Sequence, residues 1–459
     1  MFRFVRSPHL PLEGFVRLSP SPLLSPPDPS LPNGTSMRFL HCADLHLGVE
    51  NYGRIDPASG LHTRFVDFVR CLEFVVDLAL EEGVDMVLFA GDIYKSPTPN
   101  PTWQREFAVQ LHRLQEKRVP TVIVVGNHDT PSSYGRATSV DVFNALALVD
   151  TYVLRRPQTL RIETASGPIQ IAGLPWPTRH YLRTAPALKE LDQEAVNRKI
   201  EQMCVAQIQE LARQLDPDEP AILASHVAAA GATYSGSERA AVIGLDPTLL
   251  TGSLAEPAFD YVALGHIHKF QDLNSGGSPP VVYAGSLERI DFGEEEEEKG
   301  CCLVSIDCEN SKGGEGAASR TTSYEFIPTP ARRFVTVRAE SYGSGADPTE
   351  AILEAISRAN IDDAVVRVIF DVVDGDGPGL HMARIHQALR TAYCVAGIYP
   401  RANPDSFPRQ RRASVTENMG LQEAMDRYID NNHALEEDRQ LLVCRALELE
   451  VQLESGSQS

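Results

Sequence analysis

Residues 38–48 read RFLHCADLHLG, an apolar run that stops at two side chains able to bind metal, Asp44 and His46. Four later segments repeat this form, in which a short apolar run ends on polar, chemically active residues. They read FAGDIY at 89–94, VGNHD at 125–129, SH at 225–226 and LGHIH at 264–268. Each apolar run has the length and composition of a buried strand. The five segments therefore predict five strands with polar side chains at their ends.

Helical patterns separate these strands. We expect the strands at residues 38–43, 85–90, 121–125, 221–225 and 261–264. Between the first two, apolar residues recur at the spacing of one helix face: Phe65, Phe68, Val69, Leu72, Val75, Val76 and Ala79. Alternating strands and helices from residue 38 to about 333 predict an α/β domain in which helices pack on a largely buried sheet.

Residues outside this region divide into three parts. Residues 1–36 are rich in Pro and Ser and are expected to be a disordered extension, so the first domain spans 37–333. Residues 334–408 predict a small α/β domain with strands at 334–339, 364–373 and 394–399 and helices at 347–359 and 379–392. Residues 409–459 predict a basic linker followed by helices at 421–429 and 436–453. The runs 294–298 and 311–319 are expected to be solvated loops.

Composition limits the class of protein. The chain has 459 residues, 42% hydrophobic and 23% charged, which suits a globular protein of two or three domains. No apolar run approaches the roughly 20 residues of a membrane helix, and the start lacks a secretory signal, so we expect a cytoplasmic protein with no membrane contact. Its eight scattered cysteines are expected to be reduced thiols. A formal charge of −20 restricts any nucleic-acid contact to a local surface.

The strand ends carry the candidate chemistry, because catalytic groups of open α/β sheets gather there. Asp44 and His46 are two residues apart, so an extended backbone would turn both side chains to the same side. Glycine precedes Asp92, Asn127 and His266, where it permits a tight turn and a close approach of the backbone to an ion or phosphate. The candidate metal ligands are Asp44, His46, Asp92, Asn127, His226, His266 and His268.

Carboxylate, amide and imidazole donors together suit Mn²⁺, Fe²⁺ or Zn²⁺ better than Ca²⁺, which prefers oxygen ligands alone. Seven ligands are too many for one ion, so we expect two ions with one bridging carboxylate. Such a pair keeps an excess of positive charge and favours an anion, which points to phosphoester hydrolysis. His128 is not needed as a ligand, and we assign it to transition-state stabilisation or to proton delivery to the leaving group.

The ordered motifs HCADLHLG, FAGDIY, VGNHD, SH and LGHIH resemble those of the calcineurin-like metallophosphoesterases. Within that superfamily, LHCADLHLG, ALGHIHKFQ and YAGSLERIDFGEEEEEKG are similar to the SbcD group of DNA repair nuclease subunits, over residues 37 to about 302. The resemblance implies an α/β fold with a β-sandwich flanked by helices, a small α/β capping domain at 334–408 and C-terminal helices.

The same resemblance implies how the ligands are shared. One ion would be held by Asp44, His46, Asp92 and His268, and the other by Asp92, Asn127, His226 and His266, with His128 as the catalytic histidine that binds no metal. Mn²⁺ is the implied metal, with Mg²⁺, Fe²⁺ and Zn²⁺ as alternatives. The implied activities are a 3′ to 5′ exonuclease on duplex DNA and an endonuclease on single strands or hairpins, which would place the protein at the nucleoid.

The expected partners are inferred from the absence of an ATP-binding loop motif and from the family resemblance. The chain contains no G-x-x-x-x-G-K-[ST] loop, so any ATP dependence would come from a partner. The resemblance implies an SbcC-like, SMC-type ATPase, and a homodimer of this chain within a heterotetramer. The C-terminal helices are the candidate docking site for the ATPase. Their apolar stripe could equally fold back on the chain's own core.

Five basic residues are candidate phosphate contacts, and two rival functions stay open. Lys95 stands where some relatives carry a second catalytic histidine, and it could contact a phosphate. Arg401, Arg409, Arg411 and Arg412 form a basic cluster that could contact phosphate or lie in a solvated loop. The rivals are a metallophosphoesterase acting on small phosphoesters or phosphoproteins, and a scaffold subunit whose site is inactive. A missing ligand would mark the scaffold, and none is missing.

Overall fold

The computed structural model describes residues 35–131, 133, 135–178, 192–236, 246–309, 319–340, 347–372 and 380–402, and four residues at 439, 442, 443 and 445. The chain divides into two compact units. Unit 1 comprises Met1–Val49 and Thr63–Ala331, and unit 2 comprises Glu50–His62 and Arg332–Ser459. Residues 1–34, the helix expected at 421–429 and most of the helix expected at 436–453 lie outside the described residues.

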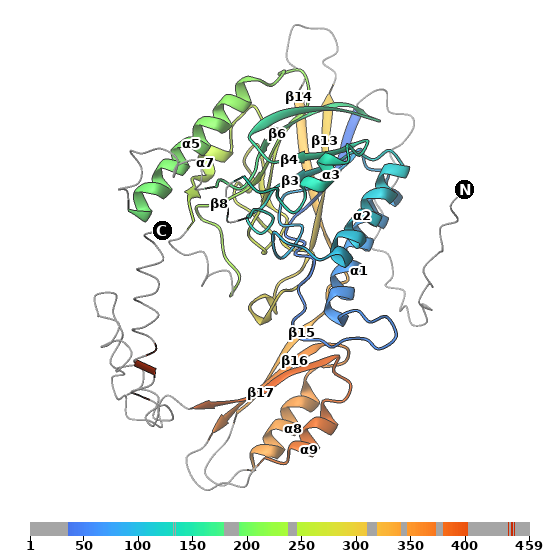
Figure 1. The fold of residues 1–459 in the computed structure, drawn as a ribbon, viewed down its shortest axis with the longest axis vertical. Helices are drawn as coiled ribbons and strands as arrows, with labels where there is room; N and C mark the ends of the chain where they lie inside the picture. Colours follow the sequence, from blue (N-terminus) through green and yellow to red (C-terminus); the bar gives the residue numbers. More distant parts are fainter. Residues whose placement is uncertain are drawn as a thin grey trace. The chain divides into compact units, whose positions relative to one another are not determined.

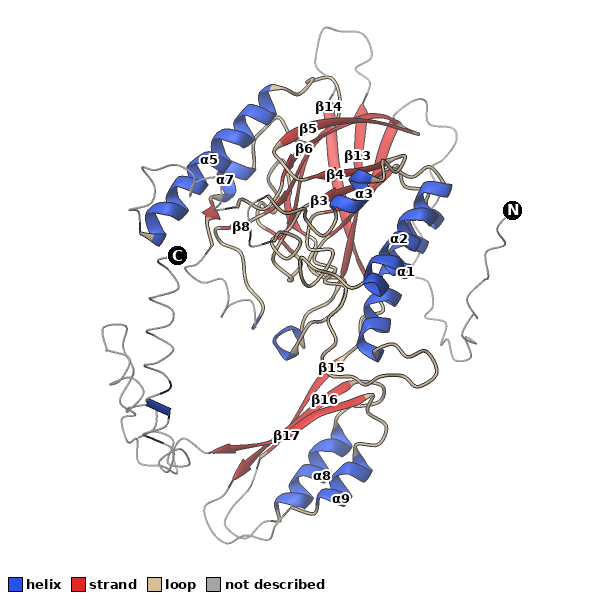
Figure 2. Cartoon of the chain, in the orientation of Figure 1, coloured by secondary structure: helices blue, strands red, loops and turns tan. Residues whose placement is uncertain are grey.

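Unit 1 is built on two six-stranded sheets in the described part of the chain (Figures 1 and 2). The first sheet has the order β14 (Ser319–Pro328), β13 (Gly300–Glu309), β1 (Thr35–Cys42), β2 (Met86–Phe89), β3 (Thr121–Val124) and β4 (Thr151–Leu154). The second has the order β11 (Gln271–Asp272), β12 (Val281–Tyr283), β10 (Tyr261–Gly265), β7 (Ala221–His226), β6 (Gly167–Leu174) and β5 (Gln158–Thr164). The five predicted strands are confirmed, although β1 starts at Thr35, inside the extension that was expected to be disordered.

Strand direction fixes where the polar strand ends lie. Strands β1 to β4 run parallel to one another, β13 pairs antiparallel with β1, and β14 pairs antiparallel with β13. In the second sheet β12, β10, β7 and β6 are parallel, and β11 and β5 are antiparallel. Parallel strands bring their carboxyl ends to one edge of each sheet, so the polar segments that follow them meet there.

The core of unit 1 lies between the two sheets. Phe39, Leu88 and Val122 from the first sheet pack in one buried cluster with Ile222 and Ala263 from the second. A β-sandwich therefore replaces the single sheet that the strand and helix alternation alone suggested, in agreement with the fold implied by the resemblance.

Helices cover the outer faces of this sandwich (Figure 1). Helices α1 (Thr63–Glu82) and α2 (Pro101–Glu116) lie on the side of the first sheet, where Phe107 of α2 contacts Phe89 of β2 at 5.6 Å between ring centroids. Helix α5 (Gln193–Arg213) and the short α7 (Thr251–Leu254) share a buried cluster with the outer residues of the second sheet. The predicted apolar face of α1 is confirmed, since all of its residues are buried except the half-buried Val69.

Four short elements complete unit 1. Helix α3 (Asp141–Ala145) precedes β4, β8 (Ala228–Ala229) pairs with β9 (Thr248–Leu249), and the 3-10 helix η2 (Phe292–Glu294) precedes β13. None of the described cysteines forms a disulfide, and most are buried, as expected for reduced thiols; Cys444 lies outside the described residues. No described helix combines the length and apolarity that crossing a membrane requires.

The described residues between 334 and 402 of unit 2 form a three-stranded parallel sheet and two helices. The elements are β15 (Phe334–Ala339), α8 (Pro348–Arg358), β16 (Val365–Val372), α9 (Met382–Ala388) and β17 (Cys394–Ala402). Helix α8 begins where the sequence predicted, because the Asp347 carboxylate accepts the Thr349 N–H at 2.8 Å. Both helices pack on the sheet through one apolar cluster that includes Ile352, Val366 and Ile385.

Candidate metal centre

All seven predicted ligands lie at the carboxyl ends of the parallel strands. Asp44 and His46 follow β1, Asp92 follows β2 and Asn127 follows β3 in the first sheet. In the second sheet, His226 ends β7 next to Gly265 of β10, which places it beside the segment that carries His266 and His268. The five strand ends thus bring together side chains that are far apart in the sequence, from Asp44 to His268.

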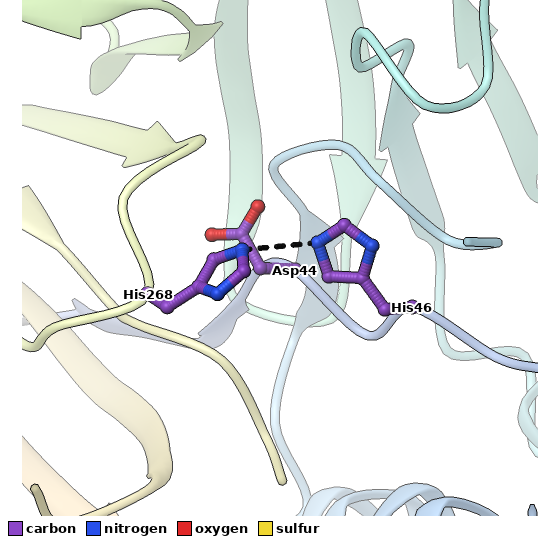
Figure 3. Close-up of side chains that lie close together, drawn as sticks. All are labelled: Asp44, His46 and His268. Atoms are coloured by element: carbon purple, nitrogen blue, oxygen red, sulfur yellow. Dashed lines mark hydrogen bonds between the residues drawn. The ribbon is translucent and has the colours of Figure 1, made fainter. Parts of the chain in front are cut away.

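Three of these side chains form one side of the centre, which we call the His268 half: Asp44, His46 and His268. Figure 3 shows the His268 ring beside the Asp44 carboxylate, with a ring nitrogen facing His46. The two Nε2 atoms of His46 and His268 are 3.0 Å apart, and the donor atoms of all three residues lie within 4.8 Å of one another. All three residues are buried.

The other side, the His226 half, consists of Asn127, His226 and His266. The Asn127 Oδ1 atom lies 2.8 Å from His226 Nε2 and 3.2 Å from His266 Nδ1. Asp92 stands between the halves, because its Oδ2 is 3.6 Å from His46 Nε2 and 3.3 Å from His226 Nε2. This is the position required of a carboxylate that bridges two ions.

The backbone at the ligands differs from the sequence expectation. Asp44 and His46 do not project from an extended strand: their φ angles are 50° and 45°. Asp92 has a φ of 53° and His266 a φ of 99°. Residues other than glycine rarely adopt this left-handed region, and such strain concentrates at functional sites. The expectation of an extended backbone is therefore wrong, although the two side chains do converge.

The glycines before the ligands allow the expected turn and also leave room for neighbouring ligand side chains. A Cβ on Gly91 would lie 2.1 Å from His226 Nδ1, and a Cβ on Gly126 would lie 2.1 Å from Asp92 Oδ1. Gly91 in addition has a φ of 100°, which favours glycine. Glycine is thus required here because neighbouring ligand side chains pack directly on the backbone.

Hydrogen bonds orient two imidazoles with Nε2 toward the centre. His226 Nδ1 donates to the Ala90 carbonyl at 2.8 Å, and His268 Nδ1 donates to Glu294 Oε1 at 2.8 Å. In the neutral ring this leaves the lone pair on Nε2, the tautomer that can ligate a cation. His266 differs, since its Nδ1 faces Asn127 and its buried Nε2 has no hydrogen-bond partner among the described residues.

Glu294 was expected in a solvated acidic run, and that expectation is wrong for this residue. Its side chain is fully buried, while Glu296 and Glu298 are exposed. Besides His268, the Glu294 carboxylate contacts Lys299 Nζ at 3.0 Å and accepts the Ile290 N–H at 2.8 Å. Burial alone would raise the pKa of Glu294, but the Lys299 ammonium and His268 lower it to about 2. Glu294 is therefore an anion that fixes the His268 ring.

Asp129 is a second residue whose role sequence reasoning missed. It is fully buried, and its carboxylate accepts the N–H groups of Ile93 and Gly126, both at 3.2 Å, and the Ser139 hydroxyl at 2.7 Å. These bonds tie the loop after β2 to the loop after β3. Asp129 thereby fixes the relative positions of Asp92 and Asn127 without pointing a donor atom at the centre.

The electrostatics of the centre favour cation binding. Burial holds the pKa of His46 well below its usual value, so the ring is neutral. Burial would also lower the pKa of His226, but the adjacent Asp92 outweighs it and raises this pKa to about 9. The same pair acts on Asp92, where the neighbouring histidines overcome the effect of burial and lower its pKa. A cation bound by His226 must therefore displace a proton.

His128 lies at the exposed rim of the centre. Its backbone N–H donates to Asp92 Oδ1 at 2.8 Å, and its ring lies edge-on to His46 at 4.8 Å between centroids. Its Nδ1 is 3.0 Å from the Lys95 carbonyl oxygen, so in the neutral ring Nε2 is the atom left for a substrate. His46, Asp92 and His128 also form a group that could hold a metal. The exposure of His128 and the contact of its Nδ1 with the Lys95 carbonyl favour the predicted role of a histidine that binds no metal.

The side chains predicted to contact phosphate, Lys95 and Arg401, have other partners in the structure. The Lys95 ammonium lies over the Trp103 ring, 5.1 Å from its centroid, so its main chain rather than its amine meets His128. Arg401 pairs with Asp371 on the surface of unit 2, with 2.7 Å between Nε and Oδ1. Arg409, Arg411 and Arg412 lie outside the described residues.

The residues present fit two divalent cations. Two carboxylates, one amide oxygen and four imidazoles converge, at least two of the rings present Nε2 inward, and Asp92 reaches both halves. The calcineurin-like phosphoesterase family matches residues 37–270, just over half of the chain. This chain belongs to that family.

Individual proteins similar to this calcineurin-like phosphoesterase share only a modest fraction of its sequence. The SbcD component of the nuclease SbcCD from Bacillus subtilis (strain 168) is 27% identical over 283 residues, which cover 61% of this chain and 68% of the relative. Among solved structures, TT1561 of Thermus thermophilus is 17% identical with a TM-score of 0.32, covering 58% of this chain and 93% of that one. A dimetal phosphatase from Danio rerio is 12% identical with a TM-score of 0.34, covering 62% and 98%.

Proposed function

We propose that this chain is the Mn²⁺-dependent DNA nuclease subunit of an SbcCD-type complex and hydrolyses phosphodiester bonds at a two-metal site. The observation that carries the proposal is the position of Asp92 between two sets of donors, with His128 exposed beside it. The similarity to the Bacillus subtilis nuclease component supports DNA as the substrate over a small phosphoester.

The residues that would hold the ions are the two halves of the centre, with Asp92 shared. Divalent cations there would supply Lewis acidity toward the phosphate and an activated water molecule. Mn²⁺ suits the mixture of imidazole, amide and carboxylate donors, and Mg²⁺, Fe²⁺ and Zn²⁺ are the alternatives. The Ala90 carbonyl and the Glu294 carboxylate hold His226 and His268 in place, so little reorganisation is needed when substrate binds.

His128 would act on the leaving group. In the imidazolium form, Nδ1–H would donate to the Lys95 carbonyl and Nε2–H would pass its proton to the departing 3′ or 5′ oxygen, which leaves the ring neutral. Its backbone bond to Asp92 keeps the ring at a fixed position relative to the bridging carboxylate. General acid catalysis of this kind contributes about 10² to 10⁴ in rate.

The proposed activities are a 3′ to 5′ exonuclease on duplex DNA and an endonuclease on single strands and hairpins, in DNA repair, recombination and replication. We further propose residues 334–408 as a capping domain over DNA. An SbcC-like ATPase would bind residues 409–459, and two copies of this chain would form the core of a heterotetramer in the cytoplasm, at the nucleoid.

The test compares two substrates in one experiment. Purified protein is supplied with Mn²⁺ and given end-labelled duplex DNA in one reaction and p-nitrophenyl phosphate in another. We expect DNA products that shorten from the 3′ end. Chromogenic turnover without DNA cleavage would identify a small-substrate phosphoesterase, and no turnover on either would identify an inactive scaffold subunit. Both of these results contradict the proposal.

A further inference from the structure

A large cavity lies beside the metal centre within unit 1. It is lined by the loops after β3, β4 and β6 and by helix α5, and its volume is about 1240 Å³. Pockets for a single small ligand measure roughly 300 to 1,000 Å³. The cavity is thus large enough for more than one unit of a polymeric ligand.

Its charge differs from that of the chain as a whole. Arg136, Arg155 and Arg156 line the cavity, although the chain carries a formal charge of −20. Two acidic residues also line it, but each faces a cation: Asp141 lies 3.6 Å from Arg155 Nη1, and Glu210 lies 2.6 Å from Arg213 Nη2.

The other two arginines are available to a ligand. Arg136 and Arg156 are exposed and form no ion pair with a described residue. A local excess of positive charge on an acidic protein favours an anionic ligand.

Trp176 joins the cavity to the metal centre. Its half-buried ring lines the cavity and lies 4.9 Å from the His266 ring, tilted by 39°. Its backbone N–H donates to the Val125 carbonyl at 2.9 Å, two residues before Asn127 in the chain, and prolines flank it on both sides. An aromatic face held this firmly beside arginines is the combination that binds unpaired nucleotides, whose bases stack and whose phosphates pair with cations.

We propose that this cavity binds an unpaired DNA strand, with a base on Trp176 and phosphates on Arg136 and Arg156. The inference rests on the proposed nuclease function and specifies which form of DNA the centre selects. In a duplex the bases stack on one another and cannot reach Trp176, so the cavity discriminates in favour of separated strands. A strand held there lies next to the His226 half and reaches the metals only after unpairing.

The first test removes Arg136 and Arg156. The double variant Arg136→Gln/Arg156→Gln is compared with Lys117→Gln/Arg118→Gln, which removes the same charge from exposed residues after α2. Both are titrated in Mn²⁺, in a His128→Gln background that prevents cleavage, with labelled oligothymidylate or blunt duplex DNA while fluorescence anisotropy is recorded. We expect the cavity variant to bind oligothymidylate roughly tenfold more weakly. Its salt slope should fall by about 0.7 for each phosphate that the arginines no longer neutralise.

Two comparisons separate a single-strand site from general attraction to polyanions: the control variant and the binding of duplex DNA. Wild-type affinity of the control variant for oligothymidylate, together with little change in duplex binding by the cavity variant, supports the cavity as a single-strand site. Unchanged oligothymidylate binding by the cavity variant overturns the proposal. An equal loss of affinity for duplex and single strand also overturns it, because such a loss reflects general attraction to polyanions.

A second measurement reads the stacking directly. The chain has two tryptophans, so Trp103→Phe leaves Trp176 as the sole tryptophan, whose emission is recorded under excitation that avoids the tyrosines. Oligothymidylate should quench the Trp176 emission of the Trp103→Phe protein. The quenching should be much weaker when Arg136→Gln and Arg156→Gln are added to it. Unchanged emission at saturating oligothymidylate overturns the inference. The two proposals fail separately: absence of DNA cleavage by the native protein contradicts the nuclease function, whereas normal cleavage with unchanged cavity readings contradicts this inference alone.

Discussion

The two halves of the metal centre are supported in different ways. In the His268 half, the Nδ1 of His268 is held by a buried side chain, the Glu294 carboxylate, which is itself fixed by Lys299. In the His226 half, the Nδ1 of His226 is held by a main-chain carbonyl, and the carboxylate that faces His266 Nε2, that of Asp246, lies 3.6 Å away. A side-chain support can be removed by substitution and a main-chain support cannot. The two halves should therefore respond differently to mutation.

The largest effect is expected where the halves meet. Asp92→Asn keeps the shape of the side chain but removes the charge that both halves share. We expect no measurable DNA cleavage and weaker binding of both ions, measured by calorimetric titration of metal-free protein with Mn²⁺. If one ion still bound with native affinity, Asp92 would belong to a single half and would not be the bridge.

His128→Gln should separate catalysis from metal binding. The ring is exposed and its Nδ1 already contacts the Lys95 carbonyl, so its loss should leave the ligands in place. We expect cleavage to fall by about 10² to 10⁴, with the Mn²⁺ content of the protein unchanged by elemental analysis. A loss of bound metal in this variant would instead make His128 a ligand.

Glu294→Gln tests the support of the His268 half. Outer carboxylates that orient a metal-bound histidine typically change metal affinity by about 10-fold to 100-fold. We expect a loss in that range for one of the two Mn²⁺ ions, with the other unaffected. Glu296→Gln is the matched control, because Glu296 belongs to the same acidic run and is exposed. Equal behaviour of the two variants would show that the buried bond to His268 contributes nothing.

The smallest effect is expected at the remaining histidine of the His226 half. Asp246 lies too far from His266 Nε2 for a hydrogen bond, so Asp246→Asn should weaken Mn²⁺ binding by less than about fivefold. A loss as large as that of Glu294→Gln, in the same titration, would mean that both halves rely on carboxylates and would remove the distinction between them.

The strand ends could be predicted from sequence because each one carries its own signature. An apolar run followed by Asp92, by Asn127 or by His226 marks both the strand and the donor, and parallel pairing then brings the ends together. The alternation of strands and helices did not predict the β-sandwich, because periodicity does not say whether five strands join one sheet or two.

The supporting residues could not be predicted in this way. Glu294 is the first of five identical residues, and only the tertiary position of η2 decides which carboxylate is buried against His268. Asp129 stands in the VGNHD motif, yet its role depends on N–H groups of a loop 36 positions away. The left-handed backbone of Asp44 and His46 could not be predicted either, because Asp and His, although enriched there among residues other than glycine, adopt this region only rarely.

Anomalous diffraction from crystals soaked in Mn²⁺ tests the central claim most directly. We predict two manganese peaks, one among Asp44, His46 and His268 and one among Asn127, His226 and His266, each within coordination distance of the Asp92 carboxylate. A single peak, or peaks that do not touch Asp92, would contradict the two-metal centre.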